Sequence, residues 1–587
     1  MRTQLNSNDF TFATGGVTLV DWYIADFKAI EQATVRARPL TVLTGANSSG
    51  KSSLLQALLF LAQSVDEDEP MLNGPLVRLG LPKDVIRSGA SSFTVGLRVQ
   101  PSVGLLSGTA VPGMLVAEIS YKAGKRAIEP AYIIVTDADG RTLIEATSHR
   151  VPAIDQQSIE QASRRTGTLL RVQTLDDRPA PKHIYFSFRS VLPDTMLYKQ
   201  DEATVLALYE RIFGRHQVEQ DLAVLERFLE ELRIVALHPR ESPGIDVLRK
   251  LDLLAQVVRP ERLAQQVTDL SDEEYRLLLR ELASYTARND WAVTGEGAGF
   301  GNRSGPATVA GFAPGLNRPS LGGRFADSLE AWTAVTAALR QLALSVEYLG
   351  PLREEPNVAT VKSGSRQRSL PVGARGEYTA DIVSKRAEDL VEFNDWLGNR
   401  LQASLIRGVS AWISYLGVGD AVKVLDHGKL GRGLNVRMGK VDRDLTTIGV
   451  GASQLLPVVV ACLSAPRNAL VLIEQPELHL HPAVQSRLAD FFLLARPDIS
   501  FILETHSEYL LTRIRRRVAE SVVSAEAVDI SFAEQDEGGV TRFRRLGLTE
   551  LGDLTSWPQG FFDAQDDDAR ALIVAVGKRL ETSRRPG

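Results

Sequence analysis

Apolar and polar residues change their spacing several times along this chain, and each change indicates a different kind of element. Residues 17–44 are rich in β-branched and other apolar residues and predict strands, the last of which runs into Gly45. Residues 52–64 instead place leucines three and four positions apart, which predicts a helix with one apolar face. Residues 92–150 alternate as strands do, and the sequence DADG at 137–140 predicts a hairpin turn. The first part of the chain is therefore predicted to be mostly strand, with one helix after a glycine turn.

The rest of the chain has different patterns. Residues 201–290 contain amphipathic stretches rich in Glu, Arg and Leu, which predict helices. Residues 294–323 are rich in glycine and proline and predict a mobile loop or linker. A helix followed by a strand is predicted directly after this loop. From 446 to 512 the order is helix, strand, helix, strand and helix, which is typical of a parallel α/β arrangement.

Together these patterns predict an α/β protein with a mixed N-terminal sheet, a parallel core towards the C-terminus and a mainly helical insertion. The expected domains are an N-terminal lobe, the helical insertion, a flexible loop, a C-terminal lobe and a tail of strand and helix. Their predicted limits are 1–190, 191–293, 294–325, 326–520 and 521–587. A chain of 587 residues suits roughly two to four structural units of ordinary size.

Composition narrows the class of protein only a little. Hydrophobic residues make up 44% and charged residues 24% of the chain, as in ordinary soluble globular proteins. The formal net charge of −5 gives no bulk attraction to nucleic acid, although it does not exclude a local basic patch. The single cysteine, Cys462, excludes an internal disulfide and a cysteine-based zinc site, and its apolar neighbours predict a buried side chain. The chain shows neither an apolar signal region nor a membrane-spanning apolar run, so we expect a cytoplasmic protein with no membrane partner.

The sequence GANSSGKS at 45–52 fits the phosphate-binding pattern G-x-x-x-x-G-K-[ST]. Glycines let the backbone approach phosphate oxygens, and the N–H groups at the start of the next helix point at the phosphates. Lys51 is expected to reach the β- and γ-phosphates, and the Ser52 hydroxyl to bind Mg²⁺. A strand before the loop and a helix after it strengthen this interpretation. The nucleotide-binding residues expected here are Gly45, Asn47, Gly50, Lys51, Ser52 and Ser53.

Two later stretches have the chemistry of a composite nucleotide site. TIGVGASQLLPVVV at 447–460 is a glycine-rich turn, then Ser453 and Gln454, then an apolar helix. Such a loop can present a serine and a helix N-terminus to a γ-phosphate held by another subunit, whereas the alternative is an ordinary helix capped by Ser453. FILETHSEYLL at 501–511 is an apolar strand that ends at Thr505 and His506. We favour His506 as a sensor of the γ-phosphate or the attacking water over a histidine buried in the core.

The stretch LVLIEQPELHLHP at 470–482 is a buried strand that ends in a carboxylate, Glu474, which is expected to hold Mg²⁺ together with Ser52. The next residue, Gln475, cannot accept a proton from water, so a general base is missing there, although a glutamine can still orient the water. Glu474 and Glu477 are the nearby acids that can take the proton instead. We therefore expect slow hydrolysis. The expected catalytic residues are Glu474, Gln475, Glu477 and His506.

In their order along the chain, these motifs resemble those of the ABC-type AAA ATPases of the RecF/SMC-like and OLD (overcoming lysogenization defect) group, including the PtuA-like ATPases. The resemblance covers residues 20–100 and 345–515 and includes YLGPLREEP at 348–356. It implies an ABC-type P-loop ATPase head, ATP and Mg²⁺ as cofactors, and a homodimer or higher oligomer whose heads sandwich ATP. Ser453 and Gln454 would then contact nucleotide across the dimer, and Glu474 and His506 would occupy the Walker B and switch-histidine positions. ELHLHP would be the loop that crosses to the partner subunit.

The resemblance also bears on function. OLD nucleases carry a Toprim domain after the ATPase, but only about 80 residues follow His506, too few for such a domain and the tail. We therefore expect no nuclease in this chain and a partner effector, a nuclease encoded nearby. The expected function is an ATPase that acts as a gate in bacterial anti-phage defence. The alternative is a nucleotide-gated DNA-binding clamp or scaffold in recombination or repair, with little hydrolysis.

Two further groups of residues have competing interpretations. Glu477, His479 and His481 would share one face of a strand and suggest a metal site, but Pro476 and Pro482 bracket them and favour a loop. The basic runs RIRRR at 513–517 and RFRR at 542–545 would suit a nucleic-acid backbone, whereas charge on a surface helix is the simpler account.

Overall fold

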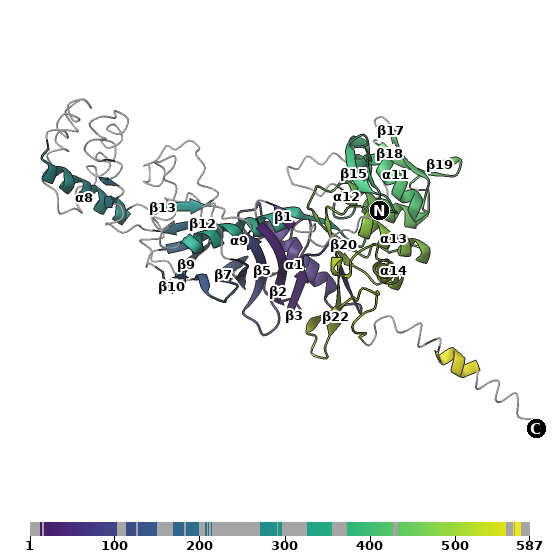
Figure 1. Ribbon diagram of the computed structural model, residues 1–587, viewed down its shortest axis with the longest axis horizontal. Coiled ribbons are helices and arrows are strands. Elements are labelled where there is room, and N and C mark those ends of the chain that lie inside the picture. Colours follow the sequence, from purple (N-terminus) through teal and green to yellow (C-terminus); the bar gives the residue numbers. More distant parts are fainter. Residues whose placement is uncertain are drawn as a thin grey trace, which may run out of the picture. The chain divides into compact units, whose positions relative to one another are not determined.

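Figure 1 shows the computed structural model of the chain. The residues that it describes are 12–14, 17–101, 113–124, 127–148, 168–180, 184–198, 206–207, 209–210, 213, 270–289, 292–295, 326–354, 372–426, 432–445, 447–558, 568 and 570–576. The chain divides into two compact units, Met1–Glu129 with Ala337–Gly587 and Pro130–Thr336. Within the described part of the chain, no helix is both long enough and apolar enough to cross a membrane.

Five parallel strands form the centre of the first unit. Their order across the sheet is β14, β20, β21, β4 and β22, and each strand runs parallel to its neighbours. Their bounds are Val346–Leu349 for β14, Leu470–Glu474 for β20, Ser500–Glu504 for β21, Leu40–Gly45 for β4 and Val528–Gln535 for β22. Every residue of β20 is buried, as expected for a parallel strand that is covered on both faces. The parallel α/β core that the sequence predicts is therefore confirmed.

Antiparallel strands extend this sheet beyond β22. Strand β23 runs antiparallel to β22, and its first residues pair in parallel with β3. From there the order is β3, β2, β5 and β6, and each of these pairs is antiparallel. The bounds are Thr541–Leu546 for β23, Ile30–Arg36 for β3, Val17–Phe27 for β2, Ser92–Pro101 for β5 and Leu115–Ala123 for β6, with the short β1, Phe12–Thr14, paired to β2. The mixed N-terminal sheet predicted from the alternating pattern is confirmed.

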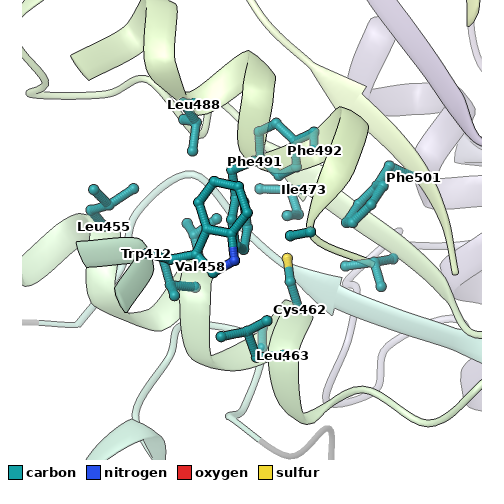
Figure 2. Packing of buried hydrophobic residues seen from close by; sticks show 14 of the residues in the cluster. Trp412, Leu455, Val458, Cys462, Leu463, Ile473, Leu488, Phe491, Phe492 and Phe501 are labelled. Carbon is teal, nitrogen blue, oxygen red and sulfur yellow. The ribbon is translucent and has the colours of Figure 1, made fainter. Parts of the chain in front are cut away.

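The helices of the first unit include α1 and the group α10 to α14, and this group shares one large apolar core, part of which is drawn in Figure 2. Their bounds are Lys51–Ser64 for α1, Thr379–Lys385 for α10, Leu405–Leu416 for α11, Val450–Ser464 for α12, Pro482–Leu494 for α13 and Glu508–Ala519 for α14. Trp412 on α11 meets Phe491 on α13 edge to face, with ring centroids 5.1 Å apart. Helices α13 and α14 lie side by side (Figure 1). The Cys462 side chain is buried in this core, as its apolar neighbours predict.

A buried arginine closes the C-terminal end of α12. The guanidinium group of Arg496 is 5% exposed and donates hydrogen bonds to the carbonyl oxygens of Cys462, Leu463 and Ala465, each at 3.1 Å. It also donates to the Asp498 carboxylate at 2.7 Å. The last carbonyl groups of a helix lack partners within the helix, so this cation satisfies groups that burial would otherwise leave unpaired.

Two small antiparallel sheets complete the first unit. One is the hairpin of β15 and β16, and the other contains β17, β18 and β19. Their bounds are Leu390–Asn394, Arg400–Ser404, Ala421–Asp426, Arg432–Met438 and Val441–Asp444. The sequence patterns described above do not predict them.

The second unit is a run of antiparallel strands with a helix. Strands β7, β8, β9, β11, β12 and β13 pair in that order, and β10 pairs with β9. Their bounds are Ile128–Asp137, Thr142–Thr147, Thr168–Leu175, Ile184–Arg189, Leu192–Tyr198 and Ala292–Gly295, with Arg178–Pro179 for β10. The hairpin turn predicted from DADG joins β7 to β8, where the Asp137 N–H donates to the Arg141 carbonyl at 3.1 Å. Trp332 on α9 (Ala326–Ser345) stacks on Phe186 with ring centroids 3.8 Å apart.

Parts of the predicted organisation fall outside the described residues. Within the expected helical insertion, the structure describes α8 (Asp272–Asn289) together with β12 and β13, and most of 199–269 lies outside the described part. The expected flexible loop, from 296 onward to 325, lies outside it as well. The tail contributes β22 and β23, and residues 570–576 are helical, as the sequence predicts. The five predicted domain limits stay predictions.

Candidate functional site

The phosphate-binding loop joins the central strand β4 to helix α1. Gly45 and Gly50 have φ angles of 136° and 91°, which residues with side chains rarely adopt, and Gly50 is the N-cap of the helix. Lys51 is the first residue of α1, and its side chain is buried. The ammonium group donates to the carbonyl oxygens of Gly45 at 3.1 Å and Ala46 at 2.6 Å. Burial lowers the pKa of Lys51, while the nearby Glu504 carboxylate opposes that shift. Asn47 is exposed in the loop, and Ser53 is half-buried on the helix.

The two loop glycines are also required by strands from near the end of the chain. A Cβ atom on Gly45 would lie 2.2 Å from the carbonyl oxygen of Ala533 on β22. A Cβ atom on Gly50 would lie 2.6 Å from the hydroxyl oxygen of Thr541 on β23. Strands β22 and β23 therefore form a wall directly behind the loop, which sequence motifs alone do not reveal.

Glu504 is a site residue that the sequence analysis missed. It is the last residue of β21, and the Ser52 hydroxyl donates to its two carboxylate oxygens at 2.9 and 3.1 Å. Its strand neighbours at the same level are Glu474 on β20 and Leu43 on β4. Burial raises the pKa of Glu504, and the Ser52 hydrogen bond and the Lys51 charge lower it. The signal for it was present, because Glu504 ends an apolar strand directly before Thr505 and His506.

Glu474 lies one strand further from the loop and has other partners. Its carboxylate accepts a hydrogen bond from the Tyr348 hydroxyl at 2.7 Å. Burial, and secondly the charge of Glu504, raises the pKa of Glu474 to about 7. The guanidinium group of Arg353, which is buried, donates to the backbone carbonyls of Glu474 at 3.0 Å and Gln475 at 3.4 Å. Burial lowers the pKa of Arg353 to about 10. Tyr348 and Arg353 both come from the YLGPLR stretch, to which sequence reasoning gave no role.

Gln475 is held in an unusual backbone conformation. Its φ angle is 45°, in the left-handed region that a residue with a side chain rarely enters. Its N–H donates to the carbonyl oxygen of Glu504 at 2.7 Å, so the chain turns sharply at the end of β20 and stays attached to β21. The Gln475 side chain is half-buried.

Glu477 and His506 are linked through the backbone. The N–H of His506 donates to a Glu477 carboxylate oxygen at 2.7 Å, and burial raises the pKa of Glu477. Burial, and secondly the charge of Lys51, lowers the pKa of His506, so its imidazole ring is neutral at physiological pH. Glu477 thus positions the loop that carries His506, and one of its two oxygens is already engaged.

The structure does not gather Glu477, His479 and His481 into one site. Glu477 is buried against the His506 backbone, whereas His479 is exposed with a φ angle of 64°. His481 is the N-cap of α13, where its ring nitrogen accepts from the Ala483 N–H at 3.3 Å. Across the described residues, no group of three or more potential ligands could hold a metal ion. These residues form a loop rather than a strand, as the bracketing prolines predict.

The glycine-rich turn that begins the stretch 447–460 leads into helix α12, which starts at Val450 and has Gly449 as its N-cap. The alternative in which Ser453 caps the helix is therefore wrong, because Ser453 lies within the first turn and donates its hydroxyl to the Val450 carbonyl at 2.8 Å. Ser453 and Gln454 are both 7% exposed in this chain, whereas Val450 is 56% exposed. A Cβ atom on Gly451 would lie 3.0 Å from the His479 carbonyl oxygen, so the loop packs against the HLHP segment.

The two basic runs are largely paired inside the chain. Arg513 and Arg517 on α14 flank Asp490 on α13, whose side chain is fully buried. Arg515 donates to the Gly552 carbonyl, Arg516 pairs with Glu520, Arg542 pairs with Glu31 and Asp536, and Arg545 pairs with Asp529. These contacts favour a structural role for both runs.

A nucleotide loop at the end of a central parallel strand, with acids ending the next two strands on one side of it, defines a P-loop ATPase domain. Residues 40–100 and 328–512, which together are less than half of the chain, match the family described as "AAA domain, putative AbiEii toxin, Type IV TA system". Residues 523–572, which include β22 and β23, match a family described as "Protein of unknown function (DUF3696)". The chain therefore contains a P-loop ATPase domain that matches an AAA family, followed by a segment that matches a family of unknown function.

Comparison with whole proteins does not narrow the class of ATPase further. No curated protein matches the chain. Among solved structures, a Pyrococcus furiosus Smc head domain bound to the C-terminal domain of ScpA is 14% identical, with a TM-score of 0.34 over 90% of this chain and 96% of that chain. The SMC head domain from Thermotoga maritima is 9% identical, with a TM-score of 0.31 over 90% of this chain and 98% of that chain. TM-scores this low support no further assignment, so the class rests on the AAA match and on the site.

Proposed function

We propose that this chain binds ATP with Mg²⁺ and hydrolyses it slowly, as a gate that controls a partner effector protein. One observation carries the nucleotide part of this proposal. Lys51 and Ser52 begin a helix at the end of a central parallel strand, and the Ser52 hydroxyl touches a carboxylate on the adjacent strand. A cation, a helix N-terminus and a hydroxyl next to a carboxylate are the groups that bind a magnesium nucleotide.

The residues of the loop fit phosphate. The buried Lys51 ammonium is held by two backbone carbonyl oxygens, and phosphate oxygens would replace these weak partners with charged ones. Gly45 and Gly50 let the loop lie close against β22 and β23, and Asn47 and Ser53 would complete the contacts with the phosphates. Oxygen atoms of Ser52 and of the neighbouring acids suit Mg²⁺, which neutralises phosphate charge when bound.

Slow hydrolysis follows from the surroundings of Gln475. A glutamine cannot act as a general base. The two acids nearest in sequence are both engaged, since Glu474 accepts from Tyr348 and Glu477 accepts from the His506 backbone. We propose that His506, whose pKa is lowered by burial and by the charge of Lys51, contacts the γ-phosphate or the attacking water. This arrangement supports long retention of ATP between turnovers.

The proposal also includes an oligomer and a partner protein. We propose that two ATPase heads of the ABC type sandwich ATP, with Ser453 and Gln454 approaching the nucleotide of the other subunit and the HLHP loop crossing to it. The partner would be an effector nuclease encoded nearby, in the setting of bacterial anti-phage defence. The matched family description, which names a putative toxin of a Type IV TA system, is compatible with a defence setting. A DNA-binding clamp in recombination or repair is the alternative, and ATP-dependent binding of duplex DNA in fluorescence anisotropy would favour it.

Binding of a fluorescent ATP analogue to the purified chain tests the proposal. We expect Lys51→Ala to weaken binding by about 100-fold or more, because the phosphates lose a buried charged partner worth about 3 kcal/mol. Lys83→Ala is the matched control, since Lys83 is exposed and lies outside the site, and it should bind as the unaltered chain does. Equal affinity of the Lys51→Ala and Lys83→Ala variants would overturn the assignment of the loop.

A further inference from the structure

We propose that Glu504, rather than Glu474, is the carboxylate that works with Ser52 to hold Mg²⁺ in this site. The inference rests on the proposed nucleotide function and concerns a residue to which neither the motifs nor the family matches give a role. In the structure the Ser52 hydroxyl lies 2.9 and 3.1 Å from the two oxygens of Glu504. The serine that follows the loop lysine is the residue expected to bind the metal ion, so the carboxylate in contact with it is already at the metal position.

The strand order explains why Glu504 is the nearer acid. Strand β21 lies between β4 and β20, so Glu504 ends the strand next to the loop and Glu474 ends the strand beyond it. Neighbouring strands are about 4.8 Å apart, which places the end of β20 about 10 Å from the end of β4. The Glu504 carboxylate contacts Ser52 directly, whereas the Glu474 carboxylate accepts from the Tyr348 hydroxyl.

The partners of the two acids also differ. Glu474 receives the Tyr348 hydroxyl at 2.7 Å, and the field of the buried Arg353 acts on it from the YLGPLR stretch. The pKa of Glu504 is lowered by the hydrogen bond from Ser52 and by the positive charge of Lys51, the residue expected to bind phosphate. The two carboxylates also act on each other, because the charge of Glu504 raises the pKa of Glu474, but only Glu504 has the loop residues Ser52 and Lys51 among the causes of its pKa shift.

Mg²⁺ suits this arrangement because it takes few protein ligands. It normally keeps several waters and is held by one or two protein oxygens together with phosphate oxygens. One hydroxyl and one carboxylate at the end of adjacent elements are sufficient for such a shell. The contact between Ser52 and Glu504 would then hold both oxygen ligands in place before the nucleotide arrives.

The test compares the affinity of a fluorescent ATP analogue with Mg²⁺ and with EDTA, for Glu504→Gln, Glu474→Gln and the unaltered chain. We expect Mg²⁺ to tighten binding to the unaltered chain, and Glu504→Gln to remove about tenfold or more of that gain. Without metal, Glu504→Gln should bind as well as the unaltered chain or better, because a negative charge near the phosphates is gone. Glu474→Gln should keep most of the gain. Electron paramagnetic resonance of Mn²⁺ added with ATP gives a second readout, with the bound-metal signal lost only in Glu504→Gln.

The outcomes separate this inference from the proposed function. If Glu504→Gln keeps the gain from Mg²⁺ and Glu474→Gln loses it, the assignment to Glu504 is overturned while nucleotide binding stands. If the unaltered chain binds no nucleotide with or without Mg²⁺, the proposed function fails and the assignment fails with it. Glu504→Asp covers the case in which Glu504→Gln does not fold, because it keeps the charge and withdraws it by one methylene. Glu504→Asp should lose part of the increase in affinity that Mg²⁺ gives, and full retention of that increase would count against the inference.

Discussion

Hydrolysis in this site depends on which side chain near Gln475 can take a proton from water. Gln475→Glu restores an acid at the turn after β20, where the half-buried side chain lies next to Glu474 and the β21 end. We expect steady-state ATP hydrolysis to rise by tenfold or more, since a general base typically contributes about 10²–10⁴-fold. Gln402→Glu, an exposed change on β16, is the control. A Gln475→Glu rate equal to or below that of the control would mean that another group already serves as the base.

Glu347 on β14 gives a pH dependence that is separate from the catalytic site. Burial alone raises its pKa from 4.5 to about 7. Between these two pH values the unfolded chain releases the proton and the folded chain keeps it, so the free energy of unfolding falls as the pH rises. Glu347→Gln stays neutral at every pH. We expect the variant to resemble the unaltered chain near pH 4.5 and to be more stable at pH 8, by at most about 3 kcal/mol.

Urea unfolding midpoints at the two pH values measure this effect. The difference between variant and unaltered chain should grow in the variant's favour as the pH rises through 7. A difference that is the same at both pH values would show that the pKa of Glu347 is the same in the folded and the unfolded chain, so that burial does not raise it.

The residues that sequence reasoning found and missed differ in how they are encoded. Lys51 and Ser52 were predictable because they belong to one short motif whose geometry is local. Glu504 touches Ser52 from 452 positions away, so its role depends on which strands are neighbours, and the sequence does not state that order. Tyr348 and Arg353 belong to a stretch that resembles the family, but the sequence predicts no role for them, because a hydrogen bond to the Glu474 carboxylate or carbonyl leaves no spacing pattern.

At the scale of single elements, α12 depends on a residue outside it. Arg496→Met removes the guanidinium group that donates to three carbonyl oxygens at the end of that helix, while keeping an unbranched apolar stem. Buried carbonyl groups left without donors are costly, so we expect a loss of about 2–4 kcal/mol in stability.

A matched control for this change exists on the surface. Arg467 pairs with Glu392, and its side chain is 68% exposed. Arg467→Met should cost less than about 1 kcal/mol, since exposed ion pairs contribute little. Thermal unfolding of both variants gives the comparison, and equal shifts would contradict the view that Arg496 caps α12.

Elements also show where periodicity succeeds. Strands β4, β20 and β21 are short apolar runs with no alternation, and the turn or acid that ends each run made them recognisable. The small sheet of β17, β18 and β19 has no such ending, so the pattern gave no prediction for it. Helix α12 was predicted, but its start was placed at Ser453 in one interpretation because serine is a common cap and Gly449 is a weaker signal.

For the whole molecule, the proposed dimer has a specific consequence. Val450 is an apolar residue that is 56% exposed at the start of α12, directly after the N-cap Gly449. If two heads meet at the start of α12 with ATP between them, Val450→Glu should place a charge in the interface and weaken ATP-dependent dimerisation by tenfold or more. Leu397→Glu, which alters an exposed residue beside the β15 and β16 hairpin, is the control.

Sedimentation velocity with and without ATP measures the dimerisation. All of the chains keep Gln475, so that ATP is hydrolysed slowly during the run. The unaltered chain and Leu397→Glu should sediment faster with ATP, and Val450→Glu should not. A chain that stays monomeric with saturating ATP would remove the dimer from the proposal, while leaving nucleotide binding untouched.

The wall behind the phosphate loop has a consequence for biosynthesis. Strand β4 is made early, yet its two neighbours, β21 and β22, begin at Ser500 and Val528. During translation the loop strand therefore waits unpaired until more than 450 further residues have left the ribosome. Contacts of such long sequence separation form slowly, and an unpaired central strand is a target for chaperones. A chain that ends before β22 would lack the strand that lies against Gly45, so its phosphate loop would have no wall on that side.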